Sequence, residues 1–503
     1  MAHRQGKQGV FVSFQSHQFL CVHGHFYQPP RLDPFTNQMP REHGAEPYAN
    51  FNEKITAECY WPNARLGNFE RINFDLGPTL AAWLEEAHPD LLARIVESDR
   101  LSVQRDGAGG AIAQAYNHTI LPLATSRDRR TQILWGLWDF ERRYGRAAEG
   151  MWLAETAVDL DTLTLLRELG VRYTVLAPWQ SVERIDTTEP YYIKLPGGSS
   201  IAAFFYNGPL SGLVSFDPEA TSDADRFAQQ YLAPHLNQEK RARGEDQIIL
   251  IASDGELYGH HKAFRDQFLG HLTREAASHA GYQVTTLERY LRDHPPTREA
   301  WLRGPSSWSC HHGVARWSDG CACTPGDSAW KRPLRDAMDH LRQRLDALYE
   351  RETVSMLREP WSARDAYLGL RSGWTDAATF WRTEGRRGRR PLLRSQETRV
   401  MKLLEAEYYG QWLYTSCGWF FEDLDRIEPR NDIAFARKAI SLVWQATGVD
   451  LQTAFMRDLK ATRSSVTGVT GADLYRAFPP VNELPPLPKP TKGAKGAADE
   501  SAA

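Results

Sequence analysis

Two carboxylates stand at the ends of apolar runs in the first half of this 503-residue chain. Glu155 follows residues 150–154, and Asp254 follows residues 248–253. Apolar runs of this length are typical of strands buried on both faces, as in parallel sheets. Because catalytic groups in such folds lie at the carboxyl ends of strands, we expect the two acids to share one cleft. A facing pair of carboxylates is the machinery of glycoside hydrolysis.

Acids also end strands merely because turns favour them, so the neighbouring side chains must decide between the two readings. The run 19–22 predicts a first strand, which leads directly into His23, His25, Tyr27 and Gln28. These side chains offer hydrogen-bond donors and acceptors at the end of a strand. A loop with solvated histidines is the alternative.

The intervening sequence predicts the elements that position these groups. Residues 173–177 and 201–206 read as strands, and residues 161–170 and 223–236 read as helices. Alternation of strand and helix implies parallel strands joined by right-handed crossovers. We therefore predict an incomplete (β/α) barrel over residues 18–310. The stretch 52–71 is expected to be a loop.

The second half of the chain has a different pattern of apolar residues. Leucine and methionine recur at helical spacing over residues 334–348, and residues 401–419 and 432–444 also read as helices. We predict a mainly α-helical domain over residues 311–480. Its aromatic cluster is expected to be core: Tyr408, Tyr409, Trp412, Trp419, Phe420 and Phe421. Residues 1–17 are expected to be flexible, and the low-complexity tail 481–503 to be disordered.

Composition excludes several classes of function. A formal net charge of −3 gives no basic face for nucleic acid. No apolar run approaches the length of a membrane span, and the start of the chain lacks the pattern of a signal peptide. Six sparse, irregularly spaced cysteines indicate a reducing compartment, so we expect a cytoplasmic protein. The oligomeric state is left open.

Four stretches resemble the motifs of family 57 of the glycoside hydrolases, which act largely on α-glucans through an incomplete (β/α) barrel plus helices. Residues 25–29 resemble the first motif, with Tyr27 where the family often has a histidine. Residues 110–118 resemble the second motif, 152–155 the third and 254–259 the fourth. The chain from Ser307 onward resembles an uncharacterised domain attached to one branch of that family.

This resemblance implies a retaining mechanism in which Glu155 is the nucleophile and Asp254 the acid/base. Retention requires carboxyl groups about 5–5.5 Å apart, whereas inversion requires about 6.5–9.5 Å. We expect the substrate, an oligosaccharide or polysaccharide, to be bound by the following residues: His25, Gln28, His118, Trp152, Trp179, Glu256, Trp308 and His312. Hydrolysis and transfer to another sugar are not separated, and no cofactor or catalytic metal is expected.

Two other classes of function stay open. A metal-dependent hydrolase or deacetylase on a similar barrel would use residue types that bind zinc, and these are present at His23, His25, Asp254, His260 and His261. A non-catalytic carbohydrate-binding protein is the other, although both carboxylates are present.

A second group of residue types suited to zinc lies after the predicted barrel, at Cys310, His312, Cys321 and Cys323. The spacing fits no standard zinc finger. These side chains are therefore candidates either for a structural metal site or for simple packing at the junction of the two domains.

Overall fold

The computed structural model describes residues 16–386 and 392–478. The predicted tail, 481–503, lies outside the described residues, as does the predicted flexible start apart from residues 16 and 17. The described chain divides into two compact units. The first comprises residues 16–30 and 39–314, and the second comprises residues 31–38 and 315–478 with the gap noted above.

The first unit is built on a ten-stranded sheet in the order β10-β6-β7-β5-β4-β3-β2-β1-β8, with β9 pairing with β1. Paired strands are parallel except β6 and β7. The order ends at β10 and β8 without closing, which confirms the predicted incomplete barrel. The strands are β1 Gln18–Phe26, β2 Asn73–Leu76, β3 Ala111–Gln114, β4 Gly150–Trp152, β5 Tyr173–Leu176, β6 Tyr191–Lys194, β7 Ser200–Phe205, β8 Gln247–Asp254, β9 Tyr282–Val284 and β10 Arg298–Glu299.

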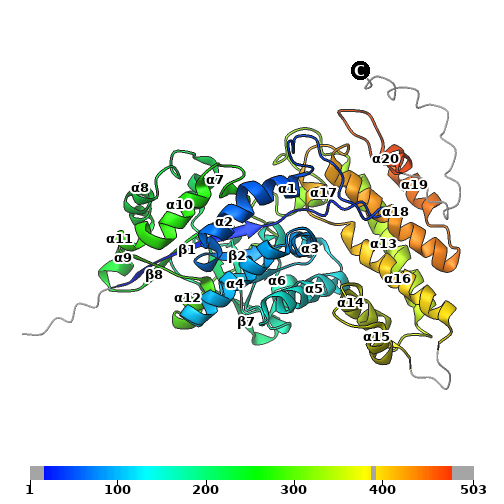
Figure 1. The fold of residues 1–503 in the computed structure, drawn as a ribbon, viewed down its shortest axis with the longest axis horizontal. Helices are drawn as coiled ribbons and strands as arrows, with labels where there is room; N and C mark the ends of the chain where they lie inside the picture. Colours follow the sequence, from blue (N-terminus) through cyan, green and yellow to red (C-terminus); the bar gives the residue numbers. More distant parts are fainter. Residues whose placement is uncertain (1–15, 387–391, 479–503) are drawn as a thin grey trace, which may run out of the picture. The chain divides into compact units, whose positions relative to one another are not determined.

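Helices pack on this sheet, as Figure 1 shows, with α5 against β3 and α7 against β8. Side-chain caps begin several of them; Asp159, for example, accepts the backbone N–H of Thr162 at the start of α6. The helices are α1 Phe51–Ile55, α2 Trp61–Leu66, α3 Pro78–Ala87, α4 Pro89–Asp106, α5 Ser126–Tyr144, α6 Leu160–Glu168, α7 Gly208–Phe216, α8 Ala224–Arg226, α9 Gln238–Ala242, α10 Arg265–His271, α11 Ala277–His279 and α12 Leu287–Asp293.

Strand β8 shows why the apolar runs are continuous. Ile249 and Ile251 face a core layer that includes helix residues such as Leu80 and Leu269. Ile248 and Leu250 face the other side of the sheet, where they join a second apolar cluster. Successive side chains of a strand point to opposite faces, so a strand covered on both sides needs apolar residues at every position.

The prediction of a loop over residues 52–71 is wrong. The chain forms α1, a π-helical turn η1 (Thr56–Tyr60), α2 and a short 3-10 helix η2 (Asn68–Glu70). Asn50 caps the start by accepting from the N–H of Glu53, and Gly67 ends α2 with a left-handed φ of 67°. Because several buried positions of this segment are polar, its sequence lacks the apolar stripe of an ordinary helix.

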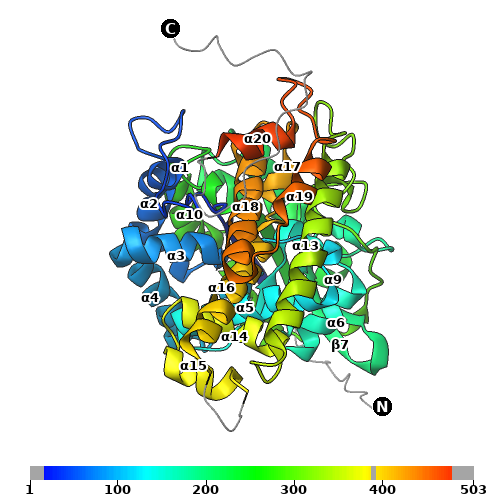
Figure 2. The same ribbon diagram turned by 90° about the vertical axis from the view of Figure 1, so that its right-hand side faces the viewer.

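The second unit is helical, as predicted, and Figure 2 shows its long helices α13, α16 and α18 running beside one another. In the predicted aromatic cluster, Tyr408, Tyr409 and Trp419 are buried and the other three are partly buried. No helix in the described ranges combines the length and the apolar character that a membrane crossing requires. The helices are α13 Lys331–Thr353, α14 Pro360–Arg371, α15 Ala377–Glu384, α16 Arg394–Trp412, α17 Cys417–Phe420, α18 Ile427–Thr447, α19 Gln452–Leu459 and α20 Gly471–Ala477.

Candidate active site

The register of three parallel strands places Asp75, His25 and Asp254 side by side. His25 on β1 pairs with Asp75 on β2 and with Asp254 on β8. All three residues lie at or near the carboxyl ends of their strands, where parallel folds carry their catalytic groups. Glu155 follows the end of β4 on the same sheet. The two carboxylates predicted to be catalytic therefore lie at the same side of the sheet, formed by the carboxyl ends of its strands.

Glu155 is held in an unusual backbone conformation. Its φ is 57° and its ψ is 22°, and the next residue, Thr156, has a φ of 48°. A left-handed backbone costs a side-chain-bearing residue about 1 kcal/mol or more, and such strain concentrates at functional sites. Trp308 Nε1 and Ser309 Oγ donate to Glu155 Oε2 at 2.9 Å and 2.7 Å.

The pKa of Glu155 reflects this setting. The surrounding protein raises the pKa by displacing water, and the negative charge of Asp254 adds to the rise. The hydrogen bonds from Ser309 and Trp308 oppose it, because they stabilise the ionised form. The charge of Asp254 thus acts on the Glu155 carboxyl group, and the charge of His25 acts on both acids.

Asp254 keeps contact with solvent at the end of β8, whereas the strand before it is buried. Even so, the dense protein around the carboxyl group raises its pKa, and the charge of Asp75 adds to this. Positive charge on His25 and His261 works in the opposite direction. A carboxyl group with a raised pKa is suited to donating a proton to a leaving group.

His25 is the centre of a buried polar network. Its Nδ1 donates to Asp75 Oδ2 at 2.8 Å, and His23 Nε2 lies 3.2 Å from Asp75 Oδ1. Burial alone would lower the pKa of His25, but the charge and hydrogen bond of Asp75, together with Asp254 and Glu256, raise it to about 9. Burial would raise the pKa of Asp75, and the two histidines lower it. His25 and Asp75 thus form an ion pair at neutral pH.

His118 joins this network from outside the strands. Its Nε2 lies 3.1 Å from Nε2 of His25, its φ is 53°, and its ring stacks on Tyr27 at 3.9 Å. Burial and the positive charge of His25 keep the pKa of His118 well below its usual value. His118 is therefore neutral and accepts a hydrogen bond from His25. Both nitrogens of His25 are therefore engaged within the protein, and His25 acts on the site through its charge.

Glu256 turns away from Asp254 into a buried cage of donors. Tyr60 Oη donates to Glu256 Oε1 at 2.7 Å, the backbone N–H of Tyr27 donates at 3.2 Å, and Gln28 Nε2 lies at 3.5 Å. Burial, aided by the charge of Asp254, raises the pKa of Glu256 to about 7. Gln28 and Glu256 therefore contact each other, and both are almost fully buried.

The three tryptophans predicted to bind the substrate, where their rings could stack on sugar, differ in exposure. Trp152 has no exposed surface, and its ring stacks on His23 and His25 with centroids 4.5 Å and 5.1 Å away. Trp152 therefore supports the network, and sugar stacking by it is not supported. Trp179 is 42% exposed and Trp308 is partly exposed, so these two keep surface for a ligand.

His312 lies with a different group of side chains. Its ring and the thiols of Cys310, Cys321 and Cys323 place their ligand atoms within 4.8 Å of one another. The fold therefore brings together the four residues that the sequence suggested as a possible metal site. The prediction that His312 contacts substrate stays a prediction.

Asp75, Tyr60 and Ser309 carry interactions that the sequence did not reveal. Asp75 is the residue before the last in the short strand β2, which lacks the continuous apolar run that marked Glu155 and Asp254. Tyr60 lies in the segment wrongly expected to be a loop. Ser309 follows Trp308 in the sequence, and nothing in its spacing points to Glu155.

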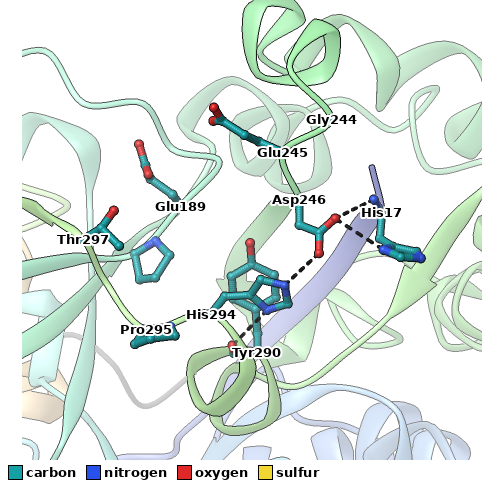
Figure 3. Close-up of a pocket in the computed structure, with 10 residues that line it drawn as sticks. His17, Glu189, Gly244, Glu245, Asp246, Tyr290, His294, Pro295 and Thr297 are labelled. Atoms are coloured by element: carbon teal, nitrogen blue, oxygen red, sulfur yellow. Dashed lines mark hydrogen bonds and ion pairs between the residues drawn. The ribbon is translucent and has the colours of Figure 1, made fainter. Parts of the chain in front are cut away.

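A pocket of about 440 Å³ lies at the amino ends of the strands, next to the residues that precede β1 and β8 (Figure 3). In it His17 and His294 point at Asp246, with His294 Nε2 3.0 Å from Asp246 Oδ2. Backbone and histidine contacts lower the pKa of Asp246 despite partial burial, which alone would raise it. Asp246 is therefore a structural partner of these two imidazoles, and it precedes β8, whereas Asp254 lies at the other end of that strand.

Two family models match the chain. The model described as glycosyl hydrolase family 57 matches residues 15–302, which include every strand of the sheet. The model described as a domain of unknown function (DUF3536) matches residues 327–482. The first match covers more than half of the chain.

Individual proteins are similar over shorter stretches. Alpha-amylase 1 of Dictyoglomus thermophilum is 26% identical over 228 residues, which are 43% of this chain and 31% of that protein. The 4-alpha-glucanotransferase of Thermococcus litoralis is 26% identical over 189 residues, 35% of this chain and 27% of that protein. The chain thus spans less than a third of the length of these two curated relatives.

The fold is similar to that of a solved structure, an exo-type maltose-forming amylase from Pyrococcus sp. ST04. The TM-score is 0.71 at 14% identity, over 88% of this chain and 82% of that one. The likeness in structure concerns the fold, and the family match concerns the sequence. The family match over more than half of the chain shows that the chain belongs to glycosyl hydrolase family 57, with a domain of unknown function after the family's own domain.

Proposed function

We propose that this protein is a retaining glycoside hydrolase or transglycosylase that acts on α-glucans, with Glu155 as nucleophile and Asp254 as acid/base. The observation that carries the proposal is that Glu155 and Asp254 lie at the carboxyl ends of strands of one sheet, where the charge of His25 acts on both acids. Family membership and the names of the matched relatives, an alpha-amylase and a 4-alpha-glucanotransferase, support the choice of α-glucan.

Glu155 has the features of a nucleophile. Trp308 and Ser309 hold Oε2, which orients the carboxylate and favours its ionised form. The ionised carboxylate attacks the anomeric carbon and forms a glycosyl-enzyme, while the bond to the leaving oxygen breaks. The strained backbone of Glu155 fixes the direction of that attack.

Asp254 supplies and then removes the proton. Its raised pKa favours the protonated carboxyl group, which is the form that donates a proton to the leaving oxygen. In the second step its carboxylate deprotonates the incoming water or sugar hydroxyl, and the bond to Glu155 breaks. Water as acceptor gives hydrolysis, and a sugar hydroxyl gives transfer. The cytoplasmic location predicted from the cysteines stays a prediction.

The contacts of the histidines favour this chemistry over a zinc hydrolase. His25 directs Nδ1 to Asp75 and Nε2 to His118, and His23 contacts Asp75 and Asn73. Both rings therefore serve a proton and charge network behind Asp254. A zinc ion bound by these histidines would require each ring to exchange a buried partner for the metal.

Product analysis tests the proposal. Purified protein is incubated with maltooligosaccharides, amylose and glycogen, in parallel with Glu155→Gln and Asp254→Asn and with the control Glu219→Gln, whose side chain is 83% exposed. We expect shortened or rearranged chains from the wild type and the control, and a loss of at least about a thousandfold in the other two.

The anomer that is released first, followed by NMR, should be the α form if the enzyme retains configuration. Full activity of Glu155→Gln or Asp254→Asn would refute the assignment of roles. Unchanged glucans in every reaction would remove the substrate class. Activity that disappears with a chelator and returns with zinc, in a protein whose Glu155→Gln variant remains active, would favour the metal hydrolase.

A further inference from the structure

Four side chains with the chemistry of a zinc site meet in a single stretch of chain after the barrel strands. Cys310, His312, Cys321 and Cys323 place their sulfur and nitrogen atoms within 4.8 Å of one another. All four belong to the continuous stretch 310–323, so the cluster depends on the course of one loop. The glycosidase mechanism assigns no role to these three cysteines and one histidine.

The loop is shaped so that its two ends return to each other. The carbonyl oxygen of Ala315 accepts the backbone N–H groups of Ser318, Asp319 and Gly320, which closes a tight turn midway. Gly320 has a φ of 82°, and a Cβ there would lie 2.2 Å from Ser328 Oγ, so this turn requires glycine. A second turn follows, in which Thr324 N–H donates to the oxygen of Cys321.

The donor set matches a structural zinc site. Three thiolates and one imidazole form a common tetrahedral set, and four protein ligands leave no open position for catalysis. Zn–S bonds of about 2.3 Å place neighbouring ligand atoms about 3.8 Å apart in a tetrahedron. A group already within 4.8 Å needs to contract by about 1 Å.

The charge expected for the site and the exposure of its residues also favour a metal site. Zinc with three thiolates and a neutral imidazole carries a net charge of −1, and Arg316 donates Nη2 to the oxygen of Cys323 at 2.9 Å beside it. Cysteines that serve only as packing are usually fully buried. Here Cys321 and Cys323 are partly exposed and His312 is exposed, so apolar packing does not explain the group.

We propose that Cys310, His312, Cys321 and Cys323 bind a structural zinc ion that fixes the loop carrying Trp308 and Ser309. Cys310 directly follows Ser309, whose hydroxyl donates to Glu155, and Trp308 donates to the same oxygen. The metal thereby anchors the chain one residue from the groups that orient Glu155. This link to turnover rests on the proposed function, whereas the metal site itself does not.

Metal analysis of the whole protein tests the site directly. The protein is purified without a metal-affinity tag, incubated with ZnCl₂, passed through a desalting column and measured by plasma mass spectrometry. We expect about one zinc per chain in the wild type, and less than a tenth of that in the variant with both Cys321→Ser and Cys323→Ser. The matched control is His311→Ala, which changes the exposed histidine next to His312 and should keep the zinc.

Cobalt substitution keeps the test valid if the double variant does not fold. Wild-type protein loaded with Co²⁺ should show the visible absorption of tetrahedral thiolate-bound cobalt. Three thiols should also become reactive when zinc is removed by a chelator. A wild type without zinc, a disulfide among these cysteines in non-reduced protein, or equal zinc in the double variant would overturn the proposal.

Glu155→Gln separates this proposal from the proposed function. We expect it to retain the zinc of the wild type and to lose turnover of α-glucans. Zinc removal from the wild type should lower turnover and the unfolding temperature together. Zinc binding without any glucan turnover would support the site and refute the enzyme, and turnover without zinc would refute the site alone.

Discussion

Trp308 holds Glu155 twice, by its side chain and by its backbone. The indole Nε1 donates to Glu155 Oε2 at 2.9 Å, and the backbone N–H of Trp308 donates to the carbonyl oxygen of Glu155 at 3.0 Å. Glu155, the proposed nucleophile, therefore depends on a partner 153 positions later in the chain. The two contacts fix both the strained backbone of Glu155 and the direction of its carboxylate.

Removal of the indole donor should weaken catalysis without changing the fold. A hydrogen bond to a charged group contributes about 1.5–3 kcal/mol, so Trp308→Phe is expected to lower kcat on α-glucans about tenfold to a hundredfold. The lost bond also held the pKa of Glu155 down, so the acidic limb of the profile of kcat/KM against pH should move to higher pH.

The matched control is Trp301→Phe, because Trp301 is 61% exposed. Its kcat and pH profile should equal those of the wild type. An unshifted acidic limb in Trp308→Phe, or an equal shift in Trp301→Phe, would contradict a role of the indole in orienting and ionising Glu155.

Glu256 should make the protein less stable as pH rises. Its pKa is raised from 4.5 to about 7 in the folded state, so the folded state holds a proton that the unfolded state has already lost. The unfolding free energy should therefore fall by about 3 kcal/mol as pH rises from about 4.5 to 7. Glu256→Gln is expected to abolish this part of the dependence, because glutamine does not titrate and can still accept from Tyr60.

Urea denaturation at pH 5 and pH 8 measures this effect. The wild type and Glu219→Gln should both lose stability between the two pH values, and Glu256→Gln should lose markedly less. Identical pH dependence in all three proteins would show that Glu256 titrates normally and that the cage around it does not hold a proton.

In the second unit, the charge of Glu407 should contribute strongly to stability. It is fully buried, and its Oε2 lies 2.7 Å from Arg342 Nη2 and 3.5 Å from Arg364 Nη1. Glu407→Gln removes the negative charge that both guanidinium groups share, at a cost of about 3–5 kcal/mol. Glu405→Gln, at a partly exposed position of the same helix, is the control and should change the unfolding free energy by less than about 0.5 kcal/mol. Equal effects in calorimetry would refute the importance of the buried charge.

The strands and their terminal acids could be predicted because they depend on local rules. The run 248–253 is apolar at every position but the last, which only a strand covered on both faces requires, and Asp254 follows it directly. The helical second half follows from the spacing of its leucines in the same way. These signals lie within a few neighbouring residues.

The contacts that tune the acids could not be predicted, because they join distant parts of the chain. β2 has only four residues and two of them are polar, so Asp75 did not stand out. Tyr60 lies in a helix whose buried face includes Thr56 and Asn63, which the apolar pattern does not reveal. Trp308 reaches Glu155 only through the fold. Position along one strand is local information, and pairing between side chains is not.

Asp75 is expected to control the charge of His25. In the wild type the pKa of His25 is about 9, because Asp75, Asp254 and Glu256 outweigh the lowering by burial. Asp75→Asn removes the strongest of these influences, so the pKa of His25 should fall and His25 should lose its charge at a lower pH. The histidine ring signals of selectively labelled protein, followed by NMR from pH 5 to 10 and assigned with His25→Gln, measure this directly.

Stability should change in the same window. A folded pKa above the unfolded value of about 6.5 stabilises the protein below that pH, and this stabilisation is lost as pH rises through about 9. Asp75→Asn should therefore be most destabilising at pH 6 and less so at pH 9. Asp139→Asn, which removes another buried carboxylate paired with Arg143, controls for the loss of a buried acid and should leave the titration of His25 unchanged. If His25 titrates at the same pH in both variants, its charge is set by groups other than Asp75, and the ion pair behind Asp254 has no part in tuning the site.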